Sequence, residues 1–534
     1  MTHRAFVAFA GGGAKGIVHV GALKALEERE VRFIGVAGTS AGAIIATLVA
    51  AGFRSNELVD TESGGTLMDA LREIDPKLRR ATDLFGRPGW WRIAAFRLLS
   101  RQPLPVPLVL LAAWALPLAA ILVIITLTLP GVAGLWIAIG WAATGIALWV
   151  FARSLIGGLA DISRFRNALA ILLQRRLFPN EPGRVVKMSD FGTDARPPLK
   201  IVSANLTRRS LQLFSAERTP ETSVADAVAA SICLPVIFQP WTIGDDLYVD
   251  GGIVSNLPAW PFDEERELDP EALTIAVEIE SRPDQHKLDR FNWVPALLPT
   301  AMFGSGELNV RVAGPAEQLA LPTTFELLDF DKGVRAAVQE VGEVALAAGI
   351  RLDKRLFRLP EIYRNACQVA QALALDGLGL PPAGQGSDPR VRVAVGRLER
   401  GYAHSLRLTH SVGFDADTDE ALLVPLEGSV AGVAWRAGES VFEPYPLPHD
   451  RDLPGDANRL RRKARWSHVK WVMCIPILDE ESGEPRLLVQ LDGNTDLPSN
   501  AETATALEGV EEAVKDFFNL VLHELKELED DHGA

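Results

Sequence analysis

Two short apolar segments near the start of the chain, residues 5–10 and 31–37, each lead through a turn of small residues into a predicted helix. The helices are expected at residues 17–29 and 41–51. An order of strand, helix, strand, helix is typical of a parallel sheet covered by helices, so an α/β fold is expected. The first segment is interpreted as a buried strand, because a secretory signal needs a longer apolar region and a cleavage site.

The longest uncharged stretch, residues 102–152, holds 51 residues without Asp, Glu, Lys, Arg or His. As helix it would extend about 76 Å, enough for two crossings of a hydrocarbon core about 30 Å thick. Pro130 and Gly131 predict a break near its middle. We therefore expect a two-helix transmembrane hairpin over about residues 103–152, with a buried or a re-entrant hairpin as alternatives. Arginines beyond both ends predict a multi-pass protein of the cytoplasmic (inner) membrane, with both soluble domains facing the cytoplasm.

Composition narrows the classes of protein to consider. A formal net charge of −14 argues against nucleic acid as a partner. A content of 48% hydrophobic and 23% charged residues argues against a disordered or fibrous chain. The three cysteines, Cys233, Cys367 and Cys474, are far apart in sequence and predict neither a disulfide framework nor a metal site. No metal and no cofactor is expected.

The first motif is the glycine-rich turn at residues 11–16, between the first predicted strand and helix. Glycines at such a turn let backbone N–H groups face an anion, either a phosphate or the oxyanion of a tetrahedral intermediate. The spacing is not that of a Walker A loop. The acidic residue of a dinucleotide fold is also missing from the end of the second strand. The motif comprises Gly11, Gly12, Gly13, Ala14, Lys15 and Gly16.

The second motif is a Gly-x-Ser-x-Gly sequence that follows the second strand and opens the second helix, the context of a nucleophile elbow. It comprises Gly38, Thr39, Ser40, Ala41 and Gly42. A serine nucleophile needs a base. His19 is interpreted as a packing or hydrogen-bonding residue, and His286 is the one candidate for a triad that contains histidine.

The third motif is Asp250, followed by Gly251 and Gly252 at the end of a predicted hairpin. An Asp before two glycines is commonly a turn, but it can also supply a base. An Asp bound to Ser can take the serine proton if partial burial raises its pKa toward neutral. Upstream, Ser231 and Pro235 stand where a small-residue helix leads into a strand-like segment.

These blocks, in this order, resemble the patatin-like phospholipases. The resemblance implies a Ser–Asp dyad in which Ser40 is the nucleophile and Asp250 the general base. It also implies that the amides of the first motif, around Gly12, Gly13 and Ala14, form the oxyanion hole. Gly251, Gly252, Ser231 and Pro235 would then be supporting residues.

The C-terminal part resembles a GAF-type sensory domain, which has a central antiparallel sheet with flanking helices and binds small molecules or mediates dimers. The resemblance rests on strand-like residues 391–398 and 422–425, a hairpin within 469–491 and a closing helix at 504–528. A stretch rich in Gly and Pro at residues 376–390 is interpreted as a linker. The predicted organisation is thus a hydrolase domain over residues 1–375, the linker, and a GAF-like domain over residues 391–534.

Together these features predict an α/β fold class: a patatin-like parallel or mixed sheet between helices, interrupted by the hairpin, plus a C-terminal α+β GAF-like domain. The predicted function is a membrane-anchored lipid acyl hydrolase that cleaves carboxylic esters of membrane phospholipids through an acyl-serine and is regulated by the C-terminal domain. The expected partners are phospholipid substrate and the lipid bilayer, with a small-molecule ligand of the GAF-like domain and a homodimer as further options. A non-catalytic lipid-binding sensor and an esterase of small acyl esters are the alternatives.

Overall fold

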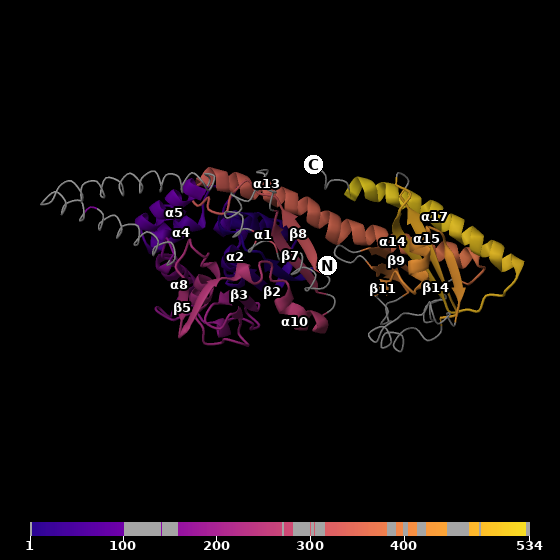
Figure 1. The fold of residues 1–534 in the computed structure, drawn as a ribbon, viewed down its shortest axis with the longest axis horizontal. Coiled ribbons are helices and arrows are strands. Elements are labelled where there is room, and N and C mark those ends of the chain that lie inside the picture. Colours follow the sequence, from indigo (N-terminus) through magenta and orange to yellow (C-terminus); the bar gives the residue numbers. More distant parts are fainter. Residues whose placement is uncertain are drawn as a thin grey trace, which may run out of the picture. The chain divides into compact units, whose positions relative to one another are not determined.

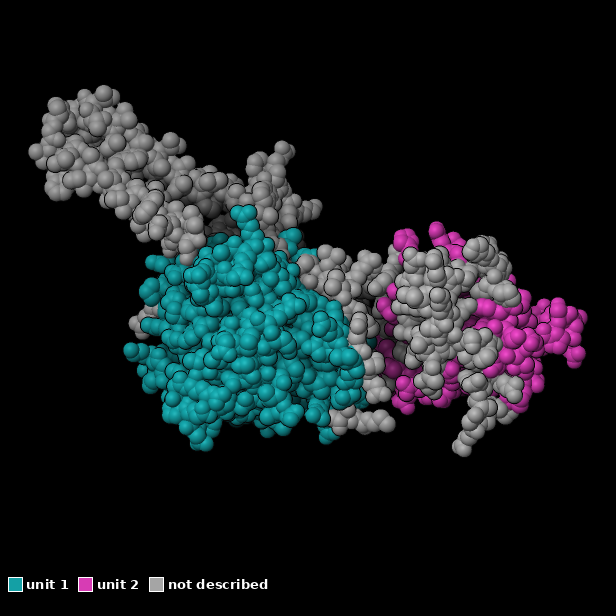
Figure 2. Space-filling view, turned by 90° about the horizontal axis from the view of Figure 1, so that it is seen from below, with its two compact units in different colours: residues 1–352 teal, residues 353–534 magenta. Residues whose placement is uncertain are grey.

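The computed structural model of the protein describes residues 3–100, 140, 158–269, 272–280, 300, 304, 316–381, 391–398, 404–413, 423–445, 469–479 and 482–529. The chain divides into two compact units, Met1–Leu352 and Asp353–Ala534 (Figure 2). Each unit is built on a sheet of its own.

The first unit contains an eight-stranded mixed sheet with the order β5-β6-β3-β2-β1-β7-β8, and β4 pairs with β3 (Figure 1). Five neighbouring strands, β3, β2, β1, β7 and β8, are parallel, and β4, β5 and β6 run antiparallel to their partners. The inner strand β1 is buried at every position but its first, as expected for a parallel strand covered on both faces. The strands are β1 (Arg4–Phe9), β2 (Arg32–Thr39), β3 (Leu199–Asn205), β4 (Ser210–Phe214), β5 (Trp241–Ile243), β6 (Asp246–Asp250), β7 (Leu273–Ile279) and β8 (Glu317–Leu321).

Helices of the first unit cover this sheet. The helix α2 (Ala41–Ala50) follows β2 and buries nine of its ten residues, which are mostly Ala, Ile, Leu and Val. The helix α1 (Val18–Glu28) follows the glycine-rich turn and packs along α13 (Val334–Leu352). Other described helices of the unit are α3 (Ser55–Leu58), α4 (Leu67–Ile74), α5 (Arg87–Ser100), α8 (Ser163–Leu177), α9 (Val224–Ile232) and α10 (Asp263–Leu268).

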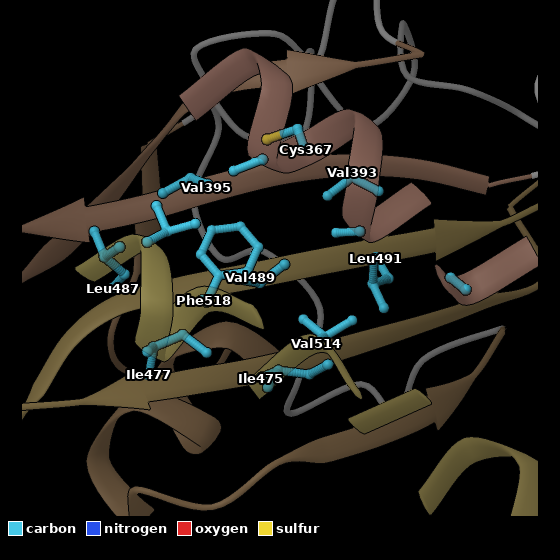
Figure 3. Packing of buried hydrophobic residues seen from close by; sticks show 14 of the residues in the cluster. Cys367, Val393, Val395, Ile475, Ile477, Leu487, Val489, Leu491, Val514 and Phe518 are labelled. Atoms are coloured by element: carbon cyan, nitrogen blue, oxygen red, sulfur yellow. The ribbon is translucent and has the colours of Figure 1, made fainter. Parts of the chain in front are cut away.

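The second unit contains a six-stranded antiparallel sheet with the order β11-β10-β9-β14-β13-β12. Its largest core lies between this sheet and two helices, α14 (Leu359–Gly377) and α17 (Ala501–Glu529), which contribute Cys367, Val514 and Phe518 (Figure 3). A smaller apolar cluster includes residues of α15 (Val430–Ala437). The strands are β9 (Val391–Leu398), β10 (Ser405–Val412), β11 (Leu423–Pro425), β12 (Val441–Pro444), β13 (Trp471–Leu478) and β14 (Pro485–Gly493).

The division into units falls before α14, whereas the sequence suggested a boundary near residue 375. The apolar face of α14 packs against β9, β10 and α17, so this helix belongs to the core of the second unit. Most of the suggested linker, residues 382–390, lies outside the described residues.

The predicted membrane hairpin requires a correction. Residues 103–152 lie outside the described part of the chain except for Gly140. Within the described part, no helix combines the length and the apolar character that a bilayer crossing demands. The longest helices there, α13, α14 and α17, carry charged residues, which are costly in hydrocarbon. The hairpin in the predicted fold class and the multi-pass location in the inner membrane are therefore not supported by the described residues, and what is supported is a mixed α/β fold.

Candidate active site

Ser40 lies at the sharp turn between β2 and α2. Its backbone has φ 52° and ψ −124°, a conformation that is uncommon for a residue with a side chain. A strained turn from strand to helix is the geometry of a nucleophile elbow. The turn needs glycine at position 42, because a Cβ there would lie 2.1 Å from the carbonyl oxygen of Phe9. The other predicted elbow residues, Gly38, Thr39 and Ala41, lie at this same junction.

Strand β3 brings Ser40 and Asp250 together. Thr39, the last residue of β2, pairs with Val202 of β3. Asp250, the last residue of β6, pairs with Ser203, the next residue of β3. Strands β2 and β6 therefore end beside consecutive residues of β3. This brings the hydroxyl of Ser40 next to the carboxylate of Asp250, although the two residues are 210 positions apart in sequence.

Ser40 and Asp250 form a short, buried hydrogen bond. The Oγ of Ser40 donates to Oδ2 of Asp250 over 2.5 Å, and Oδ1 accepts the N–H of Gly252 over 2.7 Å. Ser40 is 2% exposed and Asp250 is fully buried. Burial raises the pKa of the Asp250 carboxyl from 3.8 to about 7, while the bonds from Ser40 and Gly252 act in the opposite direction. Such a carboxylate can accept the serine proton near neutral pH.

The predicted supporting residues have different places. Ser231, in α9, accepts the N–H of Ser40 over 2.9 Å and donates to the carbonyl of Val202 over 2.6 Å, so it ties the elbow to β3. Gly251 begins the short 3-10 turn η4 (Gly251–Ile253), which the Asp250 carboxylate caps. Pro235 is half-buried in the segment after α9.

The glycine-rich turn is held at both of its ends. The N–H of Gly11 donates to the carbonyl of Asn256 over 2.9 Å, and the Asn256 side-chain amide donates back to the Gly11 carbonyl over 3.4 Å. Three residues later, the N–H of Ala14 donates to the carbonyl of Leu327 over 2.9 Å. A Cβ added to Gly11 would lie 3.1 Å from that of Ser40, which places this end of the turn beside the serine.

Two amides between these ties, those of Gly12 and Gly13, find no acceptor among the residues that the structure describes. They are available to a developing oxyanion, whereas the amide of Ala14 is already engaged. The remaining members of the motif, Lys15 and Gly16, lie in the 3-10 turn η1 (Gly13–Ile17), and the amide of Lys15 bonds to the carbonyl of Gly12. The six predicted residues are therefore not equivalent.

His19 has the structural role that the sequence indicates. The ring is fully buried in α1, and Nε2 lies 2.7 Å from the carbonyl oxygen of Ala10. Burial lowers the pKa of His19 to about 4, and the bond to Ala10 acts in the opposite direction, so the ring is neutral at neutral pH and donates from Nε2. His286, the other histidine considered, lies outside the described residues.

Two contributors to the site were missed by the sequence analysis. Asn256 follows Asp250 closely in the chain, and its position beside a catalytic motif was a usable signal. Leu327 contributes through its backbone carbonyl, which any residue could supply, so no sequence motif could have indicated it.

Comparison with known proteins shows which family the first unit is similar to. Residues 7–263 match the family model described as patatin-like phospholipase. The uncharacterized protein YqhO of Bacillus subtilis is 26% identical over 302 residues, which are 55% of this chain and 78% of that protein. The protein named probable lipid hydrolase 463L, of Invertebrate iridescent virus 6, is 24% identical over 113 residues, 21% of this chain and 32% of its own.

Solved structures of GAF domains resemble the C-terminal part. One of them, the GAF domain of a two-component sensor histidine kinase from Bacillus halodurans, is 14% identical with a TM-score of 0.21 and covers 29% of this chain and 97% of its own. The family match lies within the unit that contains the elbow. Residues 7–263, just under half of the chain, thus match the patatin-like phospholipase family model.

Proposed function

We propose that the first unit is a serine hydrolase that cleaves carboxylic esters of lipids through an acyl-serine intermediate. Ser40 is the nucleophile and Asp250 the general base. The observation that carries the proposal is the buried hydrogen bond from Ser40 to Asp250, made by a serine on a strained turn between strand and helix. The family and the name of the viral relative support lipid esters as the substrate class.

Acylation follows from this arrangement. As Ser40 Oγ attacks the ester carbonyl carbon, its proton passes to Oδ2 of Asp250, and the carbonyl oxygen becomes an oxyanion. The amides of Gly12 and Gly13 donate to that oxygen. When the tetrahedral intermediate collapses, the bond to the leaving alcohol breaks, and Asp250 returns the proton to the departing oxygen.

Deacylation repeats these steps with water. The ionised Asp250 takes a proton from a water molecule, which attacks the acyl carbon and again places negative charge on the carbonyl oxygen. Collapse releases the fatty acid and returns the proton to Ser40. Because one carboxylate serves in both halves, its pKa of about 7 suits it to give and take protons near neutral pH.

The test uses the full chain and two readouts. A fluorophosphonate should form a covalent adduct with Ser40, located by mass spectrometry, and mixed phospholipid vesicles should release free fatty acid. Ser40→Ala should lose both, whereas Ser210→Ala, at an exposed position of β4, should keep both. Release of fatty acid by Ser40→Ala at the wild-type rate would refute the proposal. Short-chain esters cleaved in preference to phospholipids would instead indicate the small-ester activity.

We further propose that the second unit regulates the first. It has a core of its own, so its folding can be disturbed selectively. Arg392 of β9 and Asp492 of β14 face each other across the sheet and form an ion pair of 2.6 Å, with side chains 1% and 8% exposed.

Arg392→Leu should destabilise the second unit by about 3 kcal/mol or more, because it leaves the Asp492 charge buried without its partner. Replacing both residues by Leu should recover most of that stability. The two variants are compared at temperatures where the second unit is unfolded in Arg392→Leu but folded in the double variant. If the second unit regulates the first, the rate of hydrolysis per labelled serine should differ between them. Equal rates would contradict regulation.

A further inference from the structure

A segment outside the region matched by the family model is in direct contact with the glycine-rich turn. Residues 323–333, here called the Leu327 segment, connect β8 to α13. Besides the hydrogen bond from Ala14 to the Leu327 carbonyl, a Cβ added to Gly13 would lie 2.4 Å from that carbonyl oxygen and 3.0 Å from Cδ1 of Leu327. Gly13 has φ +55°, so this contact also requires the backbone freedom of glycine. The segment therefore packs against the very residues whose amides are available to an oxyanion.

A buried carboxylate holds the start of the Leu327 segment. Glu340, in α13, is 5% exposed. Its Oε1 accepts the hydroxyl of Thr323 over 2.6 Å and the N–H of Thr324 over 2.8 Å, and its Oε2 accepts the hydroxyl of Thr324 over 2.6 Å. Three short hydrogen bonds to two consecutive residues fix both the position and the direction of the chain there. Leu327 follows only three residues later.

The rest of the segment is closed by its own contacts. Lys332 Nζ donates to the carbonyl of Thr324 over 2.7 Å and lies 4.1 Å from the ring centroid of Phe325. Asp329 Oδ2 accepts the N–H of Glu326 over 3.0 Å. These bonds join the two ends of the segment, so the Leu327 carbonyl moves with the part that Glu340 holds.

We propose that Glu340 is a positioning residue for ester hydrolysis. By fixing Thr323 and Thr324 it keeps the Leu327 carbonyl on the Ala14 amide, and thereby sets the direction of the Gly12 and Gly13 N–H groups toward the oxyanion. This inference rests on the proposed function of Ser40 and Asp250 and adds to it a residue about 300 positions from the elbow. Asn256 holds the other end of the turn, so the two free amides are positioned from both sides.

The expected size of the effect follows from the geometry of oxyanion stabilisation. Donors must lie about 2.7–3.1 Å from the oxyanion, and removing one donor typically lowers kcat about 10²- to 10³-fold. Misaligning the Gly12 and Gly13 amides without removing them should lower kcat by a smaller factor. We expect Glu340→Ala to lower kcat about 10- to 100-fold with little change in KM, because the ground-state ester gains little from these amides.

The test compares Glu340→Ala with Glu340→Gln in the full chain. The Gln side-chain oxygen can accept from Thr323 and from the Thr324 amide, and its NH₂ can donate to the Thr324 hydroxyl, so Glu340→Gln should stay within about threefold of wild type. Glu343→Ala, at an exposed position one turn along α13, is the matched control. All rates are expressed per serine labelled by a fluorophosphonate, which removes any effect of a smaller folded fraction.

A second readout separates positioning from simple stability. A long-chain trifluoromethyl ketone adds to a reactive serine and places a charged oxygen where the oxyanion forms, whereas the matching methyl ketone adds poorly. For Glu340→Ala, the inhibition constant of the trifluoromethyl ketone should rise about as much as kcat/KM falls, and that of the methyl ketone should stay unchanged. Unchanged kcat per labelled serine, or unchanged affinity for the trifluoromethyl ketone, would overturn the role of Glu340 alone. An inactive, unlabelled wild type would instead overturn the proposed function, and this inference with it.

Discussion

Asp250→Asn is expected to lower kcat/KM for ester hydrolysis by about 10³- to 10⁴-fold, the effect of losing a general base at a serine nucleophile. The amide keeps nearly the shape of the carboxylate, and its oxygen can still accept the Gly252 N–H, so the elbow should remain folded. It cannot accept the Ser40 proton. Steady-state rates per mole of folded protein measure the loss.

The pH dependence of wild-type activity tests the same base. The pKa of Asp250 is raised to about 7, and only the ionised carboxylate can take the serine proton. The value of kcat/KM should therefore fall about tenfold for each pH unit below about 7 and level off above it. Asp245→Asn, in the exposed turn between β5 and β6, should keep both the rate and the profile. A wild-type profile that is flat from pH 5 to 8 would exclude Asp250 as the titrating base.

The substitution Asp250→Asn is also expected to stabilise the first unit above neutral pH. Burial makes the folded state bind the Asp250 proton more tightly than the unfolded state does, because the pKa rises from 3.8 to about 7. The contribution of Asp250 protonation to the free energy of unfolding is fully present below pH 3.8, the pKa of the unfolded chain. It is lost as the pH rises through about 7, the pKa in the folded protein. The loss amounts to about 4 kcal/mol, at 1.36 kcal/mol per pKa unit.

Asparagine does not titrate and avoids this loss. The difference in unfolding free energy between Asp250→Asn and wild type should therefore widen by about 3 kcal/mol between pH 5 and pH 8, in favour of the variant. Urea unfolding of both proteins at the two pH values measures it, with Asp245→Asn as the control that should show no such divergence. A constant difference would mean that Asp250 does not carry a raised pKa. A gain in stability together with a loss of activity would mean that burial of the ionised Asp250 carboxylate lowers stability but is needed for activity.

The two residues of the proposed dyad could be picked out from the sequence because each lies in a local pattern. Ser40 stands between a strand and a helix that both show in the spacing of apolar residues, and Asp250 precedes two glycines at the end of a hairpin. What the sequence could not show was their common neighbour. The pairing of Thr39 and Asp250 with consecutive residues of β3 depends on register, which has no signal in a single sequence.

Other elements were hidden for comparable reasons. The segment after Pro235 reads as strand-like because of a run of Val, Ile and Phe, yet β5 begins only at Trp241. The backbone of Ile237 and Gln239 instead bonds to Leu159 and Ala160, which are remote in sequence. Likewise, the apolar face of α14 is plain in the sequence, but nothing in it tells which sheet the helix covers. The hydrogen bond between Ala14 and Leu327 involves only backbone atoms, so no residue type in the sequence indicates it.

The position of β3 also has a consequence for how the protein acquires its reactivity. During synthesis the elbow at Ser40 emerges long before residues 199–205, and the carboxylate of Asp250 emerges later still. Until β3 and α9 are in place, the strained backbone of Ser40 lacks the hydrogen bond to Ser231, which in turn bonds to Val202 of β3. Contacts between such distant parts of a chain form slowly and late. In the proposed mechanism the hydroxyl becomes nucleophilic only when the sheet is assembled, so the appearance of covalent labelling during refolding should report when β2, β3 and β6 have paired.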